Sequence, residues 1–274
     1  MSIGEFFGFG GYSRPAEGYM SWQHLTFVTS LVVVMIICAA VLGHRNKNKD
    51  EKQKNRVLIA AAIAIDVFEL FKIVVLCFRA EDPWHWLTEL PLFLCSIQLI
   101  TIPLAAFSKG RVKEASLDFV TIFGVLGALM GTYFAGNNYG CYPVISMDNV
   151  VSGITHCISG FASLYILISG MSRMKRKNIP ITMAILGSFC VAAYVANRCL
   201  DYNYMFLMRG DGTPYDIVFN LVKGHPVFYP LLVVLLFVIY IVAYYYCYYA
   251  IGKRVGKQEN NVEEQAKDYA RVDG

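Results

Sequence analysis

Charged residues are scarce in this chain. Asp, Glu, Lys and Arg make up 16% of its 274 residues, whereas hydrophobic residues make up 56%, and the mean hydropathy is +0.47. Soluble domains carry about 25% charged residues, so the composition argues against a soluble protein and indicates a membrane protein. The net charge of +4 reflects basic loops between apolar runs and does not indicate a nucleic-acid partner.

Motifs of several protein classes are also lacking. The sequence has neither a Gly-rich phosphate-binding loop nor a Gly-x-Ser-x-Gly elbow. No two of its five histidines share a predicted helix at ligand spacing, so neither a metal nor a cofactor is predicted. The last apolar run contains no Lys, which argues against a rhodopsin-type retinal site. An internal repeat of the kind that marks many transporters is not evident.

Seven stretches are long and apolar enough to cross a membrane, whose core of ~30 Å requires about 20 apolar residues. They are 23–43, 57–79, 89–107, 117–136, 150–171, 180–199 and 227–251. Continuous runs of this length differ from the alternating pattern of barrel strands. The sequence therefore predicts an all-α membrane protein, a bundle of seven transmembrane helices within residues 23–252.

Basic residues occupy alternate loops of this bundle. Lys and Arg cluster in 44–56, 108–114 and 172–178 and after residue 252, and the intervening loops are nearly bare of them. Because cytoplasmic loops retain positive charge, we predict the amino end outside and the carboxyl end in the cytoplasm. The first apolar run is too long for a cleaved signal peptide and lacks a basic leader, so none is expected.

Little of the chain lies outside the predicted helices. Residues 1–22 are rich in Gly and aromatics and are expected at the outer interface. The loop 201–226 is expected to cap the outer mouth of the bundle, and 253–274 is predicted to be a disordered cytoplasmic tail. Most of the eight cysteines lie within predicted helices. A bridge from Cys141 to Cys77 or Cys199 is one option, but the sequence does not determine the pairing.

The second predicted helix carries three ionisable residues, Asp66, Glu69 and Lys72. One such residue at a helix centre costs about 2.5–3.5 kcal/mol on insertion scales. Their spacing of three puts all of them on one broad face, which we expect to point into the bundle. Either Glu69 and Lys72 pair while Asp66 bonds to a neighbouring helix, or the three form a charged binding site.

Cys95 and His156 are predicted at matching depths in two different helices. Counted at 1.5 Å per residue from the outer helix ends, Cys95, His156 and Lys72 lie ~9–11 Å below the outer surface. Asn197 is closer to that surface, and Gln98 lies one turn below Cys95. A buried Cys is often only a small hydrophobe, and a lone His is often a packing residue. The shared depth is what favours a functional pair.

A thiol beside an imidazole is a nucleophile suited to acyl transfer, because the imidazole accepts the thiol proton. Candidates to orient the imidazole or to stabilise an oxyanion are Asp66, Glu69, Lys72, Gln98 and Asn197. Pro91 and Pro103 flank Cys95, and each removes a helical hydrogen bond. We therefore expect the helix around Cys95 to be bent or opened toward a cavity.

Several short motifs occur in an order and spacing typical of one family. They are LPLFLC at 90–95, LDFVTIFGVLGALMG at 117–131, GITHCISG at 153–160, DYNYMFLMRGDGTP at 201–214 and HPVFYPLLVVLLFVIY at 225–240. Over about residues 20–250 the chain resembles the YwaF-type bacterial integral membrane proteins, which are related to the transmembrane-protein-164 acyltransferases. The bacterial branch implies a polytopic protein of the plasma membrane.

The animal branch of this resemblance implies a phospholipid acyltransferase that depends on a helix-embedded cysteine and a downstream histidine. These match Cys95 and His156 in this chain. The sequence departs from the pattern at Phe93, where bacterial relatives often carry His.

Residues and resemblance together predict a multipass membrane enzyme that moves a fatty acyl group between phospholipids through a thioester on Cys95, with His156 as base. The predicted supporting or substrate-binding residues are Glu69, Lys72, Gln98, Asn197 and Asn203. The expected partners are membrane lipids, and attack by water would make the protein a lipid hydrolase. The alternative is a transporter or small-molecule receptor in which Asp66, Glu69 and Lys72 bind the ligand and Cys95 only packs.

Overall fold

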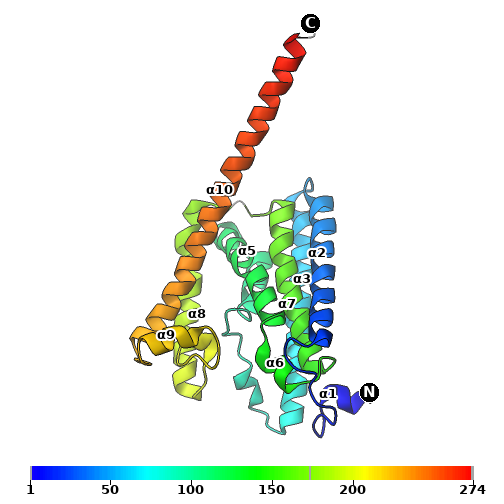
Figure 1. Ribbon diagram of the computed structural model, residues 1–274, viewed down its shortest axis with the longest axis vertical. Coiled ribbons are helices and arrows are strands. Elements are labelled where there is room, and N and C mark those ends of the chain that lie inside the picture. Colours follow the sequence, from blue (N-terminus) through cyan, green and yellow to red (C-terminus); the bar gives the residue numbers. More distant parts are fainter. Residues whose placement is uncertain (1, 173, 273–274) are drawn as a thin grey trace.

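The computed structural model describes residues 2–172 and 174–272, with side chains as far as Gly252. None of the described residues lies in a β-strand (Figure 1). The longer helices are α2 (Trp22–Asn46), α3 (Glu51–Ala80), α4 (Gln98–Phe107), α5 (Gly110–Thr132), α7 (Met147–Ser169), α8 (Ile179–Leu200) and α10 (Phe228–Val272). The shorter ones are α1 (Ile3–Phe7), η1 (His85–Thr88), α6 (Gly136–Cys141), η2 (Arg176–Asn178), η3 (Tyr204–Phe206) and α9 (Tyr215–Leu221). The predicted tail over 253–274 lies entirely outside the residues whose side chains are described, and its disorder stays a prediction.

Capping side chains fix the start of several helices. The side chains of Ser21, Asp50 and Ser146 each accept a hydrogen bond from the backbone N–H three residues ahead, at the start of α2, α3 and α7. Such caps satisfy amide groups that have no partner within the helix. Gly170, with φ of 73°, ends α7 in the left-handed conformation that glycine tolerates.

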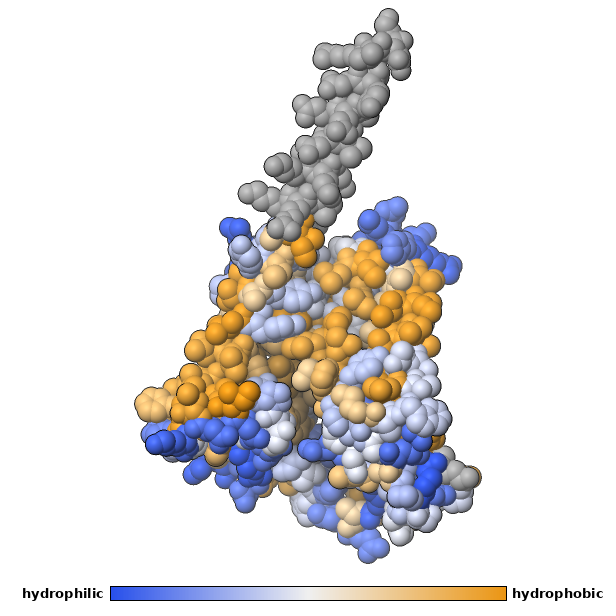
Figure 2. Space-filling view, in the orientation of Figure 1, coloured by the Kyte–Doolittle hydropathy of each residue, from blue (hydrophilic) through white to orange (hydrophobic). Residues whose placement is uncertain are grey.

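The molecule has the surface of a membrane protein. Among the described residues, five helices are long and apolar enough to cross a membrane, and α2, α7 and α8 are three of them. On the face shown in Figure 2, hydrophobic residues form a wide band across the middle of the molecule, with hydrophilic residues gathered toward both ends. The prediction of an all-helical, multipass membrane protein is confirmed. Since α3 carries several charged residues and α4 has 10 residues, the seven-span count and the orientation stay predictions.

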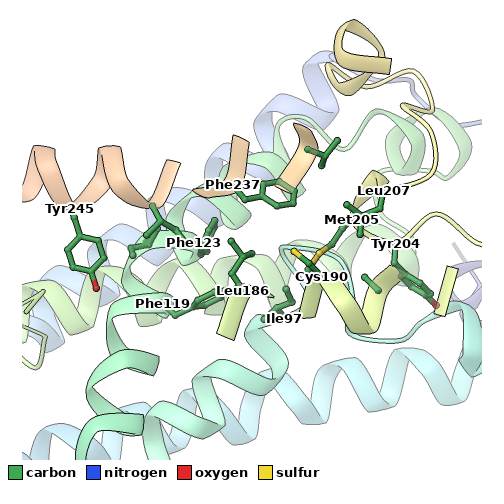
Figure 3. Close-up of a cluster of buried hydrophobic side chains, with 14 of the residues drawn as sticks. Ile97, Phe119, Phe123, Leu186, Cys190, Tyr204, Met205, Leu207, Phe237 and Tyr245 are labelled. Carbon is green, nitrogen blue, oxygen red and sulfur yellow. The ribbon is translucent and has the colours of Figure 1, made fainter. Parts of the chain in front are cut away.

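Helices α5 and α7 form the centre of the bundle. The most extensive helix contacts are between these two; α2 and α3 pack on α7, and α4 packs between α3 and α5. On the other side of α5 lie α8, α9 and α10 (Figure 1). They meet α5 through a cluster of buried side chains, labelled in Figure 3, that includes Phe119 and Phe123 of α5, Leu186 and Cys190 of α8, and Phe237 and Tyr245 of α10.

The helix predicted over 89–107, which we expected to be bent or opened around Cys95, is broken there. Residues 89–97 form turns, and α4 begins only at Gln98. Two local causes explain the break. Pro91 has no backbone N–H to donate, and the Ser96 hydroxyl accepts from the Phe93 N–H at 3.0 Å and donates to the Phe93 carbonyl at 3.1 Å, in competition with helical bonds. Cys95 therefore lies in an irregular segment and not within a helix.

A buried carboxyl group joins α5 to the far side of the bundle. Asp118 is 1% exposed, and its Oδ1 accepts a hydrogen bond from Ser172 Oγ at 2.5 Å. Its Oδ2 accepts from Asn178 Nδ2 and from Tyr245 OH, each at 2.9 Å. One side chain thus holds the segment after α7, the start of α8 and the middle of α10.

Replacing Asp118 by Ala is expected to lower the free energy of unfolding by about 3 kcal/mol or more, because each of three buried donors left unpaired costs ~1–3 kcal/mol. Thermal or denaturant unfolding of the purified protein in detergent measures this. Tyr245→Phe, which removes a single donor, is the matched control and should cost about 1 kcal/mol. Equal and small effects in both variants would show that the carboxyl group does not hold these elements together.

Candidate active site

A cavity of about 780 Å³ opens in the half of the bundle that contains α1, α6 and η1. Its volume lies within the range of about 300–1,000 Å³ found for small-molecule sites. Its walls come from α3, from the irregular segment that follows η1, from α6 and from the first turns of α7. The polar residues that line it include Glu69, Lys72, Glu89, Cys95, Ser96, Ser152 and His156. Figure 2 shows the surface hollowed in this half, between the α9 side and the α6 side.

The structure brings Cys95 and His156 together at the wall of this cavity. The Cys95 thiol and the His156 imidazole lie within interaction range of each other, and both residues line the cavity. Both rest on one face of α5, where Gly127 and Gly131 are four residues apart and therefore neighbours on the helix surface. A Cβ added at Gly127 would lie 3.5 Å from the Cys95 Cβ, and one added at Gly131 would lie 2.0 Å from His156 Nε2. The two residues that the sequence places at one depth thus lie beside neighbouring positions of α5.

A backbone carbonyl one turn earlier in α7 orients the imidazole of His156. Its Nδ1 lies 2.7 Å from the Ser152 carbonyl oxygen and 3.4 Å from the Ser152 hydroxyl. Because a carbonyl oxygen only accepts, Nδ1 carries the proton. In the neutral ring the Nε2 atom, which lies on the α5 side, is then the acceptor that can take a proton from the thiol.

The break before α4 also leaves backbone donors beside the sulfur. The N–H groups of Cys95 and Ser96 both approach the Cys95 thiol. Among the described residues, neither group donates to a main-chain or side-chain oxygen. Preorganised backbone N–H groups of this kind stabilise developing negative charge on an oxyanion. Sequence reasoning missed them, because in the expected continuous helix these amides would have been used within the helix.

A chain of charges lines the wall opposite α5. Lys72 Nζ lies 2.6 Å from Glu69 Oε1 and 3.1 Å from Glu89 Oε2, so one ammonium group bridges two carboxylates. The second partner, Glu89, was not among the predicted site residues. Asp66 does not join them: it is exposed on the outer side of α3 and does not line the cavity. The predicted common face of three charges is therefore wrong for Asp66.

Two of the other predicted supporting residues form hydrogen bonds with the protein's own backbone. Asn197 donates to the Tyr204 carbonyl at 2.9 Å and accepts from the Tyr204 N–H at 2.6 Å. Asn203 donates to the Arg209 carbonyl at 2.8 Å and accepts from the Met208 N–H at 2.9 Å. These two side chains fold the loop after α8. Gln98 is fully buried, its Oε1 accepts from Thr101 at 3.0 Å, and it does not line the cavity.

An ion pair at the rim of the cavity was not foreseen. Arg79, at the end of α3, binds both carboxylate oxygens of Asp148, at the start of α7, at 2.7 and 2.6 Å. The Tyr12 hydroxyl donates to Asp148 at 2.5 Å, which ties the amino-terminal segment to this pair. Burial and the neighbouring Asp148 raise the pKa of Tyr12 to about 12, so the hydroxyl remains a donor at neutral pH.

A helical bundle with apolar outer faces and a polar internal cavity defines a multipass membrane protein. The sequence model of the TMEM164 family matches residues 19–245, and the chain belongs to this family. Searches among curated proteins and among solved structures found no match. The family bears out one part of the resemblance seen in the sequence, whereas the link to YwaF-type proteins and a bacterial membrane stay predictions.

Gly131→Ala is expected to displace the His156 ring, since the new Cβ would lie 1.8 Å from its Cδ2. Alkylation of Cys95 by a small thiol reagent, followed by mass spectrometry of its peptide, should slow by about tenfold or more, because an unactivated thiol reacts slowly. Gly187→Ala is the matched control, since a Cβ there meets nothing within 4 Å. Unchanged labelling in Gly131→Ala would contradict the assigned contact.

Lys72→Met removes the only cation that bridges Glu69 and Glu89 among the described residues. Glu69 is buried, and breaking a buried pair leaves an uncompensated charge. We expect the free energy of unfolding to fall by about 2 kcal/mol or more. Lys72→Arg should retain most of the stability, and Glu69→Gln combined with Lys72→Met should recover part of it. Equal stability of Lys72→Met and wild type in detergent would rule out a structural role for the pair.

Proposed function

We propose that this protein is a cysteine-dependent phospholipid acyltransferase that forms a thioester on Cys95. The observation that carries the proposal is the pairing of the Cys95 thiol with a His156 ring whose Nδ1 is fixed by the Ser152 carbonyl. Membership of the TMEM164 family supports a membrane setting, where a phospholipid is the substrate at hand. The cavity beside the pair is large enough for a lipid head group and the adjoining ester.

In the first half-reaction, the Cys95 sulfur attacks the carbonyl carbon of a phospholipid ester while His156 Nε2 takes the thiol proton. The negative charge that develops on the carbonyl oxygen faces the free N–H groups of Cys95 and Ser96, and such charge stabilisation is usually the largest contribution to catalysis. The intermediate collapses, and the bond between the carbonyl carbon and the glycerol oxygen breaks. That oxygen takes the proton from Nε2, and a lysophospholipid leaves.

In the second half-reaction, the hydroxyl group of an acceptor lysophospholipid gives its proton to His156 Nε2 and attacks the thioester carbonyl. The carbon–sulfur bond breaks, and the Cys95 thiolate recovers the proton from the imidazole. His156 thus acts as base and then as acid in each half. With water in place of the lipid hydroxyl, the same steps release a free fatty acid.

The remaining cavity residues support this chemistry in different ways. Glu69 and Lys72 contribute a charged wall to the cavity that Cys95 and His156 also line. Phe93 packs its ring against Tyr204 and Phe206, with centroid distances of 5.3 and 5.8 Å. Since His156 already contacts the thiol, the mechanism does not require a second imidazole at position 93.

The proposal predicts that the purified protein, incubated with a phospholipid that carries a labelled acyl chain, gains the mass of one acyl group. Cys95→Ala should gain none and should transfer no label to an added lysophospholipid. His156→Gln should slow both steps by about 10²- to 10⁴-fold, the usual size of general-base catalysis. Cys190→Ala, which removes a buried cysteine of the cluster in Figure 3, is the matched control and should react like wild type.

Transfer of label by Cys95→Ala at the wild-type rate would refute the covalent mechanism. Release of labelled free fatty acid, with no gain of label by added lysophospholipid, would assign the protein as a hydrolase that uses the same pair.

A further inference from the structure

A second cavity, of about 720 Å³, lies at the opposite end of the bundle from Cys95. It is formed by the first turns of α3, the connection between α4 and α5, and the segment between α7 and α8. These connections carry the clusters of basic residues that predict the cytoplasmic side. The cavity shares no residue with the proposed active site.

Four lysines line this second cavity, namely Lys175, which pairs with Glu114, and Lys52, Lys109 and Lys113. In the part of the chain whose side chains are described, none of the last three forms an ion pair. Lys113 Nζ donates to the neutral Asn55 Oδ1 at 2.6 Å. Lys52 and Lys109 are exposed.

The carboxylates at the same cavity are engaged elsewhere. Glu114 contacts Lys175 at 2.6 Å and Lys177 at 3.5 Å, and Glu51 lies 3.9 Å from Lys54. The third carboxylate at the cavity, Asp118, accepts hydrogen bonds from Ser172, Asn178 and Tyr245. Among the described side chains, none of the three carboxylates lies within ion-pair distance of Lys52, Lys109 or Lys113. Within a cavity of this size, such unpaired cations favour an anionic ligand.

One wall of the cavity carries a neutral hydrogen-bond acceptor, the side-chain oxygen of Asn178. Asn178 lines the cavity and is 1% exposed. Its Nδ2 donates to Asp118, whereas its buried Oδ1 accepts no hydrogen bond from the described protein. A buried acceptor without a donor is costly, so a ligand that brings a hydroxyl hydrogen satisfies it. The cavity thus combines cations for an anion with an acceptor for a hydroxyl group.

We infer that this cavity binds a phosphate ester that carries a hydroxyl group, the chemistry found in the head group of an anionic glycerophospholipid such as phosphatidylglycerol. Lys52, Lys109 and Lys113 contact the phosphate, and Asn178 accepts from the hydroxyl. Phe107 lines the same cavity with 59% of its surface exposed, which provides an apolar contact for the beginning of an acyl chain. The site is independent of the chemistry at Cys95.

Native mass spectrometry of the purified full-length protein, titrated with phosphatidylglycerol, tests this inference. The variant Lys52→Gln/Lys109→Gln removes two exposed cations that have no protein partner, so the fold should be retained. Its affinity should fall by about tenfold or more, since each basic residue near a lipid surface contributes appreciably to binding. The control Lys47→Gln/Lys49→Gln makes the same charge change at the same end of the molecule and should stay within about twofold of wild type.

Two matched ligands complete the experiment. Phosphatidylmethanol has the same phosphate charge but no hydroxyl group, and it should bind several-fold more weakly than phosphatidylglycerol. Soluble glycerol 3-phosphate distinguishes a free phosphate ester from a lipid as the ligand. Competition with the lipid at equal concentration would identify the ligand as a free phosphate ester, and failure to compete would identify it as the lipid.

Equal weakening in both double variants would overturn the site, because it would show only general attraction to a basic surface. Equal affinity for phosphatidylglycerol and phosphatidylmethanol would overturn the role given to Asn178. A thermal unfolding midpoint for Lys52→Gln/Lys109→Gln close to that of wild type establishes that lost binding reflects the site and not the fold.

Discussion

The close approach of neighbouring segments to α5 is the constraint on which the rest of the structure depends. Added Cβ atoms on Gly124 and Gly131 would lie 2.6 Å from the Ser163 Cβ and 1.8 Å from His156, respectively. Small residues at such spacing let helix backbones approach closely in a membrane, where packing replaces the hydrophobic effect as the driving force. The same glycine face that brings α7 against α5 therefore also makes room for the imidazole beside Cys95.

This arrangement holds the proposed reacting groups on rigid elements. The His156 ring is fixed at Nδ1 by its own helix, and its other edge rests on α5. Cys95 is held by the irregular segment, which is closed by the Ser96–Phe93 hydrogen bonds. Groups positioned in this way need little reorganisation when charge develops, which is what makes a preorganised site effective.

The sequence predicts the helices of this fold well and its break poorly. The predicted ranges 23–43, 150–171 and 180–199 differ from α2, α7 and α8 by at most three residues at either end, because long apolar runs and caps mark these helices. Residues 89–107 are also apolar, so hydropathy hides the break. Only Pro91 signalled it, and proline alone does not distinguish a bend from an unwound segment.

The depth of the site residues was predicted from the sequence, but their partners were not. Depth counted along helices was enough to place Cys95 and His156 at one level, since helical rise is constant. It was not enough to identify partners, because the direction of each side chain depends on how the helices rotate against one another. Glu89 was therefore missed as the second partner of Lys72, and Asn197 was assigned to the site although it supports the backbone after α8. The backbone donors at Cys95 and Ser96 carry no side-chain signal at all.

The unwound segment before α4 also makes stability and activity depend on opposite backbone conformations. Irregular backbone at membrane depth is tolerated only where protein or a water-filled cavity surrounds it, and a continuous helix would satisfy the same amides within the chain. Substitutions that favour helix through residues 89–97 would therefore stabilise the bundle while they remove the free N–H groups beside the thiol. Pro91 affects both properties, because a helix-forming residue in its place would give a more stable protein with a less effective site.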